Sequence, residues 1–150
     1  MHRCDEPQVT PEAYKDLAAN KVTDPYGGTD TLAGTIEGVR GTRNADTIIG
    51  NDDAANTIES GAGNDTITIS GPRGDTLNGG DGNDILAGGI GQDTVNGGAG
   101  NDLLTGGVGS DTQDGGEGSD LYILGSSTDY TGDVYADTGL TGTDELRYTA

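Results

Sequence analysis

The chain has 150 residues, and its 26 acidic and 7 basic side chains give a formal net charge of −19. Only 30% of the residues are apolar, and the sequence contains neither Trp nor Phe. This composition is typical of disordered chains that cannot build an ordinary hydrophobic core. Acidity on this scale argues against binding to nucleic acid or anionic lipid, because both would be repelled, and a cation is the expected partner.

Residues 1–26 are expected to form an N-terminal tail with one short helix. Thr10 is a suitable N-cap and Pro11 suits the first turn, which predicts a helix over about residues 11–20. The stretch lacks the apolar core of a Sec-type signal peptide, and no apolar run long enough to span a membrane follows it. Cys4 is the only cysteine, so no internal disulfide can form.

A nine-residue repeat dominates residues 27–123, which are expected to form one domain. Residues 27–40 alternate loosely between apolar and polar side chains and are predicted to add strand at its N-terminal end. From residue 41 onward the unit G-G-x-G-x-D-x-U-x recurs, where U is apolar. Its sixth position is occupied by Asp46, Asn56, Asp65, Asp75, Asp84, Asp93, Asp102, Asp111 and Asp120. Its eighth position is occupied by Ile48, Ile58, Ile67, Leu77, Leu86, Val95, Leu104, Gln113 and Tyr122, of which only Gln113 breaks the pattern.

The repeat fades after Ile123, where the array is expected to close. Residues 124–150 are predicted to form a C-terminal capping segment, within which GLTGTDELR at 139–147 is a degenerate copy of the unit centred on Asp144.

The chemistry of the unit predicts an all-β fold. Glycine tolerates a positive φ, so six glycine-rich residues can turn sharply, and the three that follow can form a short strand. Two units make one coil, and successive coils stack about 4.8 Å apart as two parallel sheets with the U side chains inside. The sixth positions then separate onto two edges: Asp46, Asp65, Asp84, Asp102 and Asp120 lie on one, and Asn56, Asp75, Asp93 and Asp111 on the other.

Rows of carboxylates at this spacing repel one another. At roughly 5 Å and an effective dielectric constant of about 20, each neighbouring pair costs about 3 kcal/mol. A divalent cation between coils reverses the sign of that interaction, and the turns expose peptide carbonyls as further oxygen ligands. Such flexible, anionic, all-oxygen sites suit Ca²⁺ better than Mg²⁺, and a chain with one Cys and one His offers no zinc site. Several calcium ions are therefore predicted.

The stretch from Gly79 to Asp120 resembles the repeats-in-toxin family of hemolysin-type calcium-binding repeats, and the resemblance covers about residues 41–123. It implies a right-handed parallel β-roll. In this family one loop supplies the carbonyls of positions 2 and 4 and the position-6 carboxylate. The loop one coil later supplies the carbonyls of positions 1 and 3 and its own aspartate, so that each inner aspartate bridges two ions.

Carried onto this chain, the resemblance implies four calcium sites. The first joins Gly61, Gly63 and Asp65 to Gly79, Asp81 and Asp84. The second joins Gly80, Gly82 and Asp84 to Gly97, Ala99 and Asp102. The third, on the opposite edge, joins Gly89, Gly91 and Asp93 to Gly106, Val108 and Asp111. The fourth joins Gly98, Gly100 and Asp102 to Gly115, Glu117 and Asp120.

Other loops depart from the family pattern. A fifth site would run from Gly71, Arg73 and Asp75 to Gly88, Ile90 and Asp93, but Arg73 replaces a glycine. The earlier loops, with Thr42, Asn44 and Asp46 or with Asn56, lack the glycines and one carboxylate, and they are expected to serve as a plain coil.

Three alternatives to calcium binding fit the sequence less well. A disordered linker fits the composition, but nine units in near-perfect register argue against it. Catalysis by a protease or lipase is not expected, because His2 is the sole histidine and no H-E-x-x-H or G-x-S-x-G motif occurs. A glycosidase needs only two carboxylates, but most of the carboxylates in the array are assigned to calcium. Ice binding through loop threonines is disfavoured because position 3 on one edge reads Ala62, Asp81, Ala99 and Glu117.

The chain is therefore expected to be a non-enzymatic calcium-binding module of a secreted bacterial protein that resembles type I export substrates. It should be unfolded in low calcium and fold outside the cell, beside further domains of a parent protein. The alternative is a fragment of a larger secreted enzyme, toxin or adhesin whose active part lies outside these residues.

Overall fold

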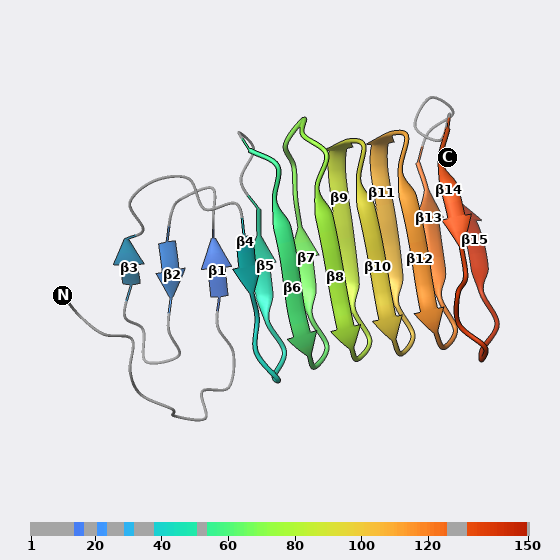
Figure 1. Cartoon of the computed structure of the whole chain (residues 1–150), viewed down its shortest axis with the longest axis horizontal. Helices are drawn as coiled ribbons and strands as arrows, with labels where there is room; N and C mark the ends of the chain where they lie inside the picture. The colour runs from blue at the N-terminus through green and yellow to red at the C-terminus, as the bar shows by residue number, and fades with distance from the viewer. Residues whose placement is uncertain are drawn as a thin grey trace.

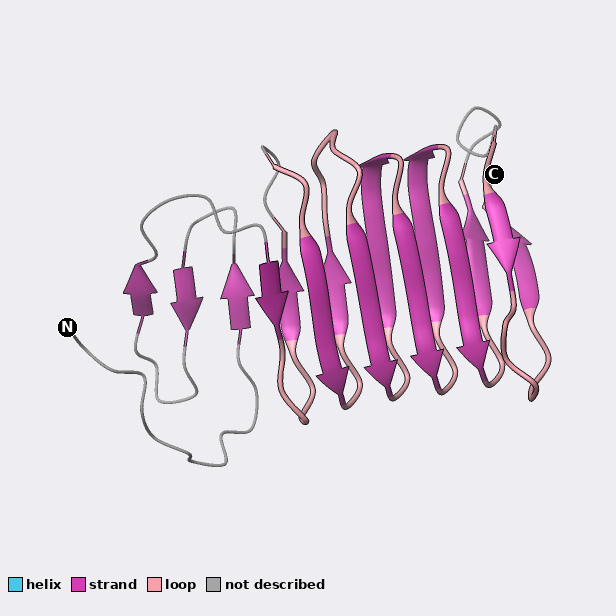
Figure 2. Cartoon of the chain, in the orientation of Figure 1, coloured by secondary structure: helices cyan, strands magenta, loops and turns pink. Residues whose placement is uncertain are grey.

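In the computed structural model, residues 38–50, 54–125 and 132–149 are described in full, and the short segments 14–16, 21–23 and 29–31 by their main chain. The regular elements of these residues are all β-strands (Figure 2). None of the described residues belongs to a helix that is long and apolar enough to cross a membrane. The first strands are β1 (Tyr14–Asp16), β2 (Lys21–Thr23), β3 (Thr29–Thr31), β4 (Gly38–Arg40), β5 (Thr47–Ile49), β6 (Thr57–Ala62), β7 (Thr66–Thr68) and β8 (Thr76–Asp81). They are followed by β9 (Ile85–Gly91), β10 (Thr94–Ala99), β11 (Leu103–Gly109), β12 (Thr112–Glu117), β13 (Leu121–Leu124), β14 (Val134–Ala136) and β15 (Glu145–Tyr148).

Alternate strands form two sheets that lie face to face (Figure 1). One sheet has the order β14-β12-β10-β8-β6-β4, and the other has the order β15-β13-β11-β9-β7-β5-β1-β2-β3. From β4 onward the pairing is parallel, and Thr94 in β10 pairs with Thr76 in β8 and with Thr112 in β12. These partners are two repeats apart, which is one coil. The predicted parallel β-solenoid is therefore confirmed.

The core is one row of apolar side chains from each sheet. Its members are Ile48, Ile58, Ile67, Ile69, Leu77, Leu86, Val95, Leu104 and Tyr122, each at most 2% exposed. Apart from Ile69, these are the eighth positions of the repeat, so the prediction that those side chains point inward is confirmed. Gln113 is also buried, at 1% exposure, and its Oε1 has no hydrogen-bond partner. The polar exception in the sequence is thus a polar group inside the core.

Further strands extend the sheets at the N-terminal end. Strand β4 pairs in parallel with β6, which agrees with the strand predicted within residues 27–40. Strand β1 pairs in parallel with β5, and β2 and β3 follow in antiparallel pairing. Of the span 11–20, for which a helix is expected, the structure describes only Tyr14–Asp16, as strand β1. The rest of that span lies outside the described residues.

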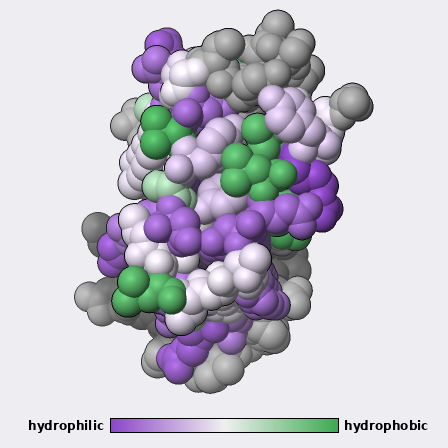
Figure 3. All heavy atoms as spheres, turned by 90° about the vertical axis from the view of Figure 1, so that its right-hand side faces the viewer, coloured by the Kyte–Doolittle hydropathy of each residue, from purple (hydrophilic) through white to green (hydrophobic). Residues whose placement is uncertain are grey.

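At the C-terminal end the sheets continue past Ile123, where the sequence repeat fades. Strand β14 pairs in parallel with β12, and β15 pairs in parallel with β13, so the strand pairing extends one coil further than expected. Val134, Leu140 and Leu146 of this last coil are exposed. Figure 3 looks onto this end and shows separate hydrophobic patches among hydrophilic atoms.

Candidate metal sites

Two ladders of aspartates run along the two edges of the roll, and in each the main-chain N–H of one member donates to the carboxylate of the member one coil later. The edge at the bottom of Figure 1, here called the Asp102 edge, has the bonds Asp46 to Asp65 (2.7 Å), Asp65 to Asp84 (2.8 Å), Asp84 to Asp102 (2.8 Å) and Asp102 to Asp120 (2.8 Å). The opposite edge, here called the Asp93 edge, has the bonds Asn56 to Asp75 (2.6 Å), Asp75 to Asp93 (2.8 Å) and Asp93 to Asp111 (2.8 Å). The predicted separation of the repeats onto two edges is confirmed.

The second oxygen of most ladder carboxylates is buried without a hydrogen-bond partner. Asp84 is 1% exposed, Asp120 2% and Asp102 3%. The buried oxygens without a partner are Oδ1 of Asp46 and Oδ2 of Asp65, Asp75, Asp84, Asp93, Asp102 and Asp120. Leaving a charged oxygen in this state is costly, and a cation would satisfy it.

Three of these oxygens, Oδ2 of Asp84, Asp93 and Asp102, share a small space with a main-chain carbonyl of the next coil. A Cβ added at Gly97 would clash with both Asp102 Oδ2 and the Gly115 carbonyl oxygen. The same arrangement recurs at Gly79, with Asp84 and Gly97, and at Gly88, with Asp93 and Gly106. These glycines occupy the first position of the repeat, where any larger residue would clash with its neighbours. The space is bordered by carboxylate and carbonyl oxygens, the ligands that calcium prefers.

Glycine at the second and fourth positions of the unit is required for a different reason. Gly80 and Gly82 have φ values of 102° and 138°, which side chains with a Cβ rarely adopt. They also lie against the carbonyl oxygens of Gly61 and Gly63 one coil earlier, where a Cβ would clash. The carbonyls of positions 2 and 4 therefore point along the roll toward the next loop.

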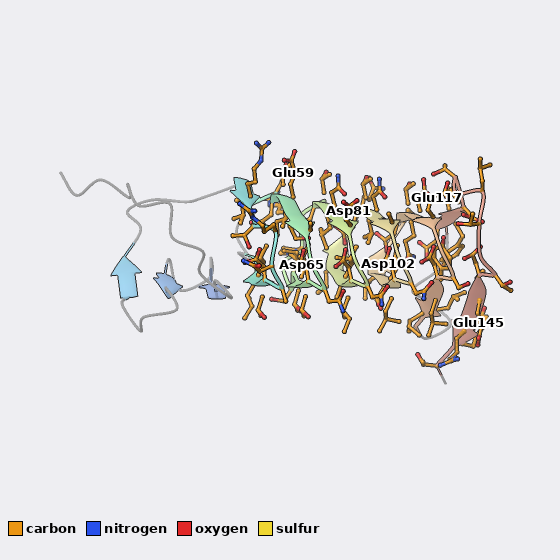
Figure 4. The ribbon with its side chains drawn as sticks, turned by 90° about the horizontal axis from the view of Figure 1, so that it is seen from below. Glu59, Asp65, Asp81, Asp102, Glu117 and Glu145 are labelled. Carbon is orange, nitrogen blue, oxygen red and sulfur yellow. The ribbon has the colours of Figure 1, made fainter. Side chains whose placement is uncertain are left out.

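The strand register places the residues of all four predicted sites in adjacent coils. The register pairs are Gly61 with Gly80, Ala62 with Asp81, Gly80 with Gly98, Asp81 with Ala99, Gly98 with Gly116, Ala99 with Glu117, Gly89 with Gly107, Ile90 with Val108 and Gly91 with Gly109. Figure 4 looks onto the Asp102 edge and shows Asp65 and Asp102 in line along the roll. Asp81 and Glu117 are exposed, so at these two positions only the main-chain carbonyl is a candidate ligand.

The loop with Arg73 follows the pattern only in part. The Arg73 carbonyl oxygen lies against Gly91 of the next coil, as a position-4 glycine carbonyl does. The Gly71 carbonyl, however, accepts the N–H of Ile90 at 3.1 Å, and Gly89 lies against Ile69 instead of a position-2 carbonyl. This loop therefore offers fewer oxygens to an ion than the four sites above.

The earlier loops supply additional hydrogen bonds to one oxygen of their ladder carboxylates, although Oδ1 of Asp46 and Oδ2 of Asp75 have no partner. One carboxylate oxygen of Asp46 accepts the main-chain N–H of Thr42 at 2.6 Å and its hydroxyl at 3.0 Å. Asn56 Nδ2 donates to the Ala54 carbonyl at 2.9 Å and to Asp75 Oδ1 at 3.1 Å. These contacts agree with the expectation of a plain coil.

Burial makes the ladder hard to ionise. Desolvation and, to a smaller extent, neighbouring carboxylates raise the pKa of Asp84, Asp93 and Asp102 from 3.8 to about 6, although a main-chain hydrogen bond opposes the change. Desolvation also raises the pKa of Asp65 and Asp120. At neutral pH the ionised ladder is destabilising, and a divalent cation would offset that cost.

Two ladder residues lie beyond the nine units of the repeat: Asp133 was not predicted from the sequence, and Asp144 was predicted only as the centre of a degenerate copy. Asp133 Oδ1 accepts the N–H of Asp111 at 2.9 Å, and Asp144 Oδ1 accepts the N–H of Asp120 at 2.9 Å, so both ladders gain a member. The available signal was Asp133 followed two residues later by Tyr135, the same spacing as Asp120 and Tyr122. The insertion before Asp133 hides this match from a search at a period of nine.

No three Asp, Glu, His or Cys side chains of the described residues form a metal-binding group by themselves. An ion between coils would therefore take main-chain carbonyls together with the ladder carboxylates, and the donors around the position-1 glycines fit calcium. Comparison with protein-family models matches residues 39–67, 69–104 and 88–122 to the family described as RTX calcium-binding nonapeptide repeat (4 copies), which covers more than half of the chain. No curated protein matches the chain.

Proposed function

Because the chain belongs to the family of RTX calcium-binding nonapeptide repeats, we propose that its roll binds several calcium ions between successive coils and folds as they bind. The main support is the row of buried carboxylate oxygens that have no hydrogen-bond partner. Those of Asp84, Asp93 and Asp102 lie where the next coil presents a carbonyl oxygen. Hydrogen bonds within the chain satisfy only half of each carboxylate, and a cation would satisfy the other half.

Four sites are proposed, with the ligand sets that the family pattern implies. Three lie on the Asp102 edge and join the loops that end at Asp65, Asp84, Asp102 and Asp120. One lies on the Asp93 edge and joins the loops that end at Asp93 and Asp111. In each site, positions 2, 4 and 6 of one loop face positions 1, 3 and 6 of the next.

Folding and binding are coupled because the metal-free roll is opposed by its own charge. The formal net charge is −19, and the core consists of one apolar row per sheet. Repulsion of about 3 kcal/mol for each neighbouring pair of ladder carboxylates opposes stacking of the coils. Bound calcium reverses this interaction, so the free energy of metal binding becomes free energy of folding.

The proposal extends to a right-handed roll in a secreted protein. Parallel crossovers between strands of one sheet are right-handed in nearly all proteins. Sites of this kind in extracellular modules bind calcium at roughly 0.1 to 1 mM, a concentration at which a chain would fold only after export. The module is proposed to be non-enzymatic, a part of a larger secreted protein that carries any activity elsewhere.

Circular dichroism during a calcium titration tests the proposal. We expect little β-structure in chelator and a cooperative gain of β-structure at roughly 0.1 to 1 mM calcium. Magnesium at the same concentration should produce a much smaller gain, because it holds its waters and demands tighter geometry. Equal β-content in chelator and in calcium would contradict the proposal.

A further inference from the structure

The ladder on the Asp102 edge continues into a loop that lies outside the nonapeptide consensus. Asp144 Oδ1 accepts the N–H of Asp120, and the Gly118 N–H donates to the Thr141 carbonyl at 3.2 Å. Inside the array, the Gly82 N–H makes the same bond to Ala99 at 2.7 Å. The loop at 137–144 therefore stacks on the loop at 115–120 as one repeat stacks on the next.

Oxygen donors of the earlier loop already face this terminal loop. The carbonyl oxygens of Gly116 and Gly118 lie against Gly139 and Gly142, where a Cβ would clash with them. Asp120 is 2% exposed, and its buried Oδ2 has no hydrogen-bond partner. It lies beside Gly115, as Asp102 Oδ2 lies beside Gly97, but here the Tyr122 hydroxyl takes the place of the next coil's carbonyl oxygen.

The terminal loop adds a carboxylate where the consensus has glycine. Asp114 pairs with Ala136 in the strand register, so Asp137 occupies the place that Gly115 has one coil earlier. The carboxyl groups of Asp137 and Asp144 lie within hydrogen-bonding distance of each other. Two carboxylates in contact repel when both are ionised, and a shared cation is the usual way to hold them together.

The Asp93 edge ends differently. Asp133 Oδ1 accepts the N–H of Asp111, and its Oδ2 accepts the hydroxyl of Tyr135 at 3.0 Å. Both oxygens of the last ladder carboxylate on that edge are therefore engaged by the protein itself. On the Asp102 edge the last ladder carboxylate, Asp144, lies instead within hydrogen-bonding distance of a second carboxylate, Asp137, and Oδ2 of Asp120 one coil earlier has no partner.

We propose that a divalent cation, calcium by its all-oxygen donor set, binds between the loops 115–120 and 137–144. Its ligands are the carboxylates of Asp120, Asp144 and Asp137 together with the carbonyl oxygens of Gly116 and Gly118. The site rests on the proposed calcium-dependent fold but lies outside the repeats that define it. It fastens the last coil, β14 and β15, to the roll.

Asp137→Asn tests the site because it removes a charged ligand from an exposed residue and leaves the repeats untouched. Equilibrium dialysis against calcium counts the ions bound to the full chain. We expect Asp137→Asn to bind one ion fewer, or to bind one ion at least about tenfold more weakly, because ligand charge sets calcium affinity. Asp144→Asn should do the same, since its amide oxygen can still accept the Asp120 N–H.

The matched control is Asp114→Asn. Asp114 is a neighbouring residue whose carboxylate is not among the proposed ligands, because its Oδ1 accepts the N–H of Thr138 at 3.0 Å and its Oδ2 accepts the Thr138 hydroxyl at 2.8 Å. This substitution should leave the ion count unchanged. Hydrogen exchange supplies a second measurement. The Glu145 N–H donates to the Asp120 carbonyl at 2.8 Å and should lose its calcium-dependent protection in Asp137→Asn, whereas the amides of β9 to β11 should keep theirs.

The outcomes separate this site from the proposed function. If the parent chain binds no calcium, the proposed function fails and the site fails with it. If the parent binds calcium, and Asp137→Asn and Asp144→Asn match it in ion count, affinity and protection of β15, the terminal site alone is overturned.

Discussion

Replacing Asp102 with asparagine should have opposite effects on the metal-free and the calcium-bound chain. Burial raises the pKa of Asp102 to about 6, so at neutral pH its carboxylate is ionised in a place that disfavours the charge. Asparagine has the same shape and no charge, and its oxygen can still accept the Asp84 N–H that Asp102 accepts at 2.8 Å. Asn56 occupies the equivalent ladder position on the opposite edge, which shows that an amide fits there.

The magnitude follows from the change in pKa. A rise from 3.8 to about 6 corresponds to about 3 kcal/mol at neutral pH, since each unit is worth about 1.4 kcal/mol. In chelator, Asp102→Asn should therefore favour the folded state by up to about 100-fold. With calcium, the same change removes a charged ligand from two proposed sites, and the calcium midpoint should rise several-fold.

Two titrations followed by circular dichroism measure these effects. A stabilising osmolyte added in chelator folds the metal-free chain, and Asp102→Asn should need less of it than the parent. The control is Asp81→Asn, which removes an exposed charge on the same edge and keeps the main-chain carbonyl; it should change either midpoint little. If Asp102→Asn folds less readily than the parent in chelator, the electrostatic reasoning is refuted.

Three further predictions concern the ladders and the polar residue in the core. Asp102→Ala should raise the calcium midpoint of folding strongly and Asp46→Ala only slightly, because Thr42 already bonds the Asp46 carboxylate; equal shifts in the two titrations would mean that the proposed register of ions is wrong. Gln113→Leu should stabilise the roll by about 1 kcal/mol and lower the calcium midpoint, since it removes a buried oxygen without a partner; a higher midpoint would indicate that Gln113 is satisfied in solution. In chelator, acidification from neutral pH to about pH 4 should increase β-structure, because carboxyls with a pKa of about 6 bind more protons in the folded than in the unfolded chain. The stability that these protons contribute is lost as the pH rises through about 6. A circular dichroism signal that does not change over this range would contradict the prediction.

The repeat allowed most of the roll to be predicted because every unit imposes the same local chemistry. Glycine at positions 2 and 4 permits the positive φ of the turns, and the apolar eighth position must point inward, as Leu77 and Leu104 do. A period of nine places alternate aspartates on opposite edges, which the hydrogen bonds of the two ladders confirm. The parallel pairing of strands 18 residues apart follows from these constraints, with no contribution from distant segments.

The remaining features depend on tertiary contacts that a period of nine does not encode. Strand β1 pairs with β5, although Thr10 and Pro11 favour the start of a helix. Asp133 joins its ladder after an insertion, because strand pairing tolerates a longer loop whereas a sequence period does not. The ligand sets themselves remain predictions, since the pattern of residues specifies which oxygens lie near one another but not which ions they bind.

The two ends of the ladders indicate where calcium is needed. At the N-terminal end, the side chains of Thr42 and Asn56 supply hydrogen bonds to the ladder from within the protein. At the C-terminal end of the Asp93 edge, Tyr135 does the same for Asp133. Between these ends Oδ2 of Asp84, Asp93 and Asp102 has no such donor, and each lies beside a carbonyl oxygen of the next coil, which cannot donate a hydrogen bond. A cation is the group that can satisfy a carboxylate and a carbonyl at once, so calcium dependence should be concentrated in the central coils and, through Asp137 and Asp144, at one corner of the last.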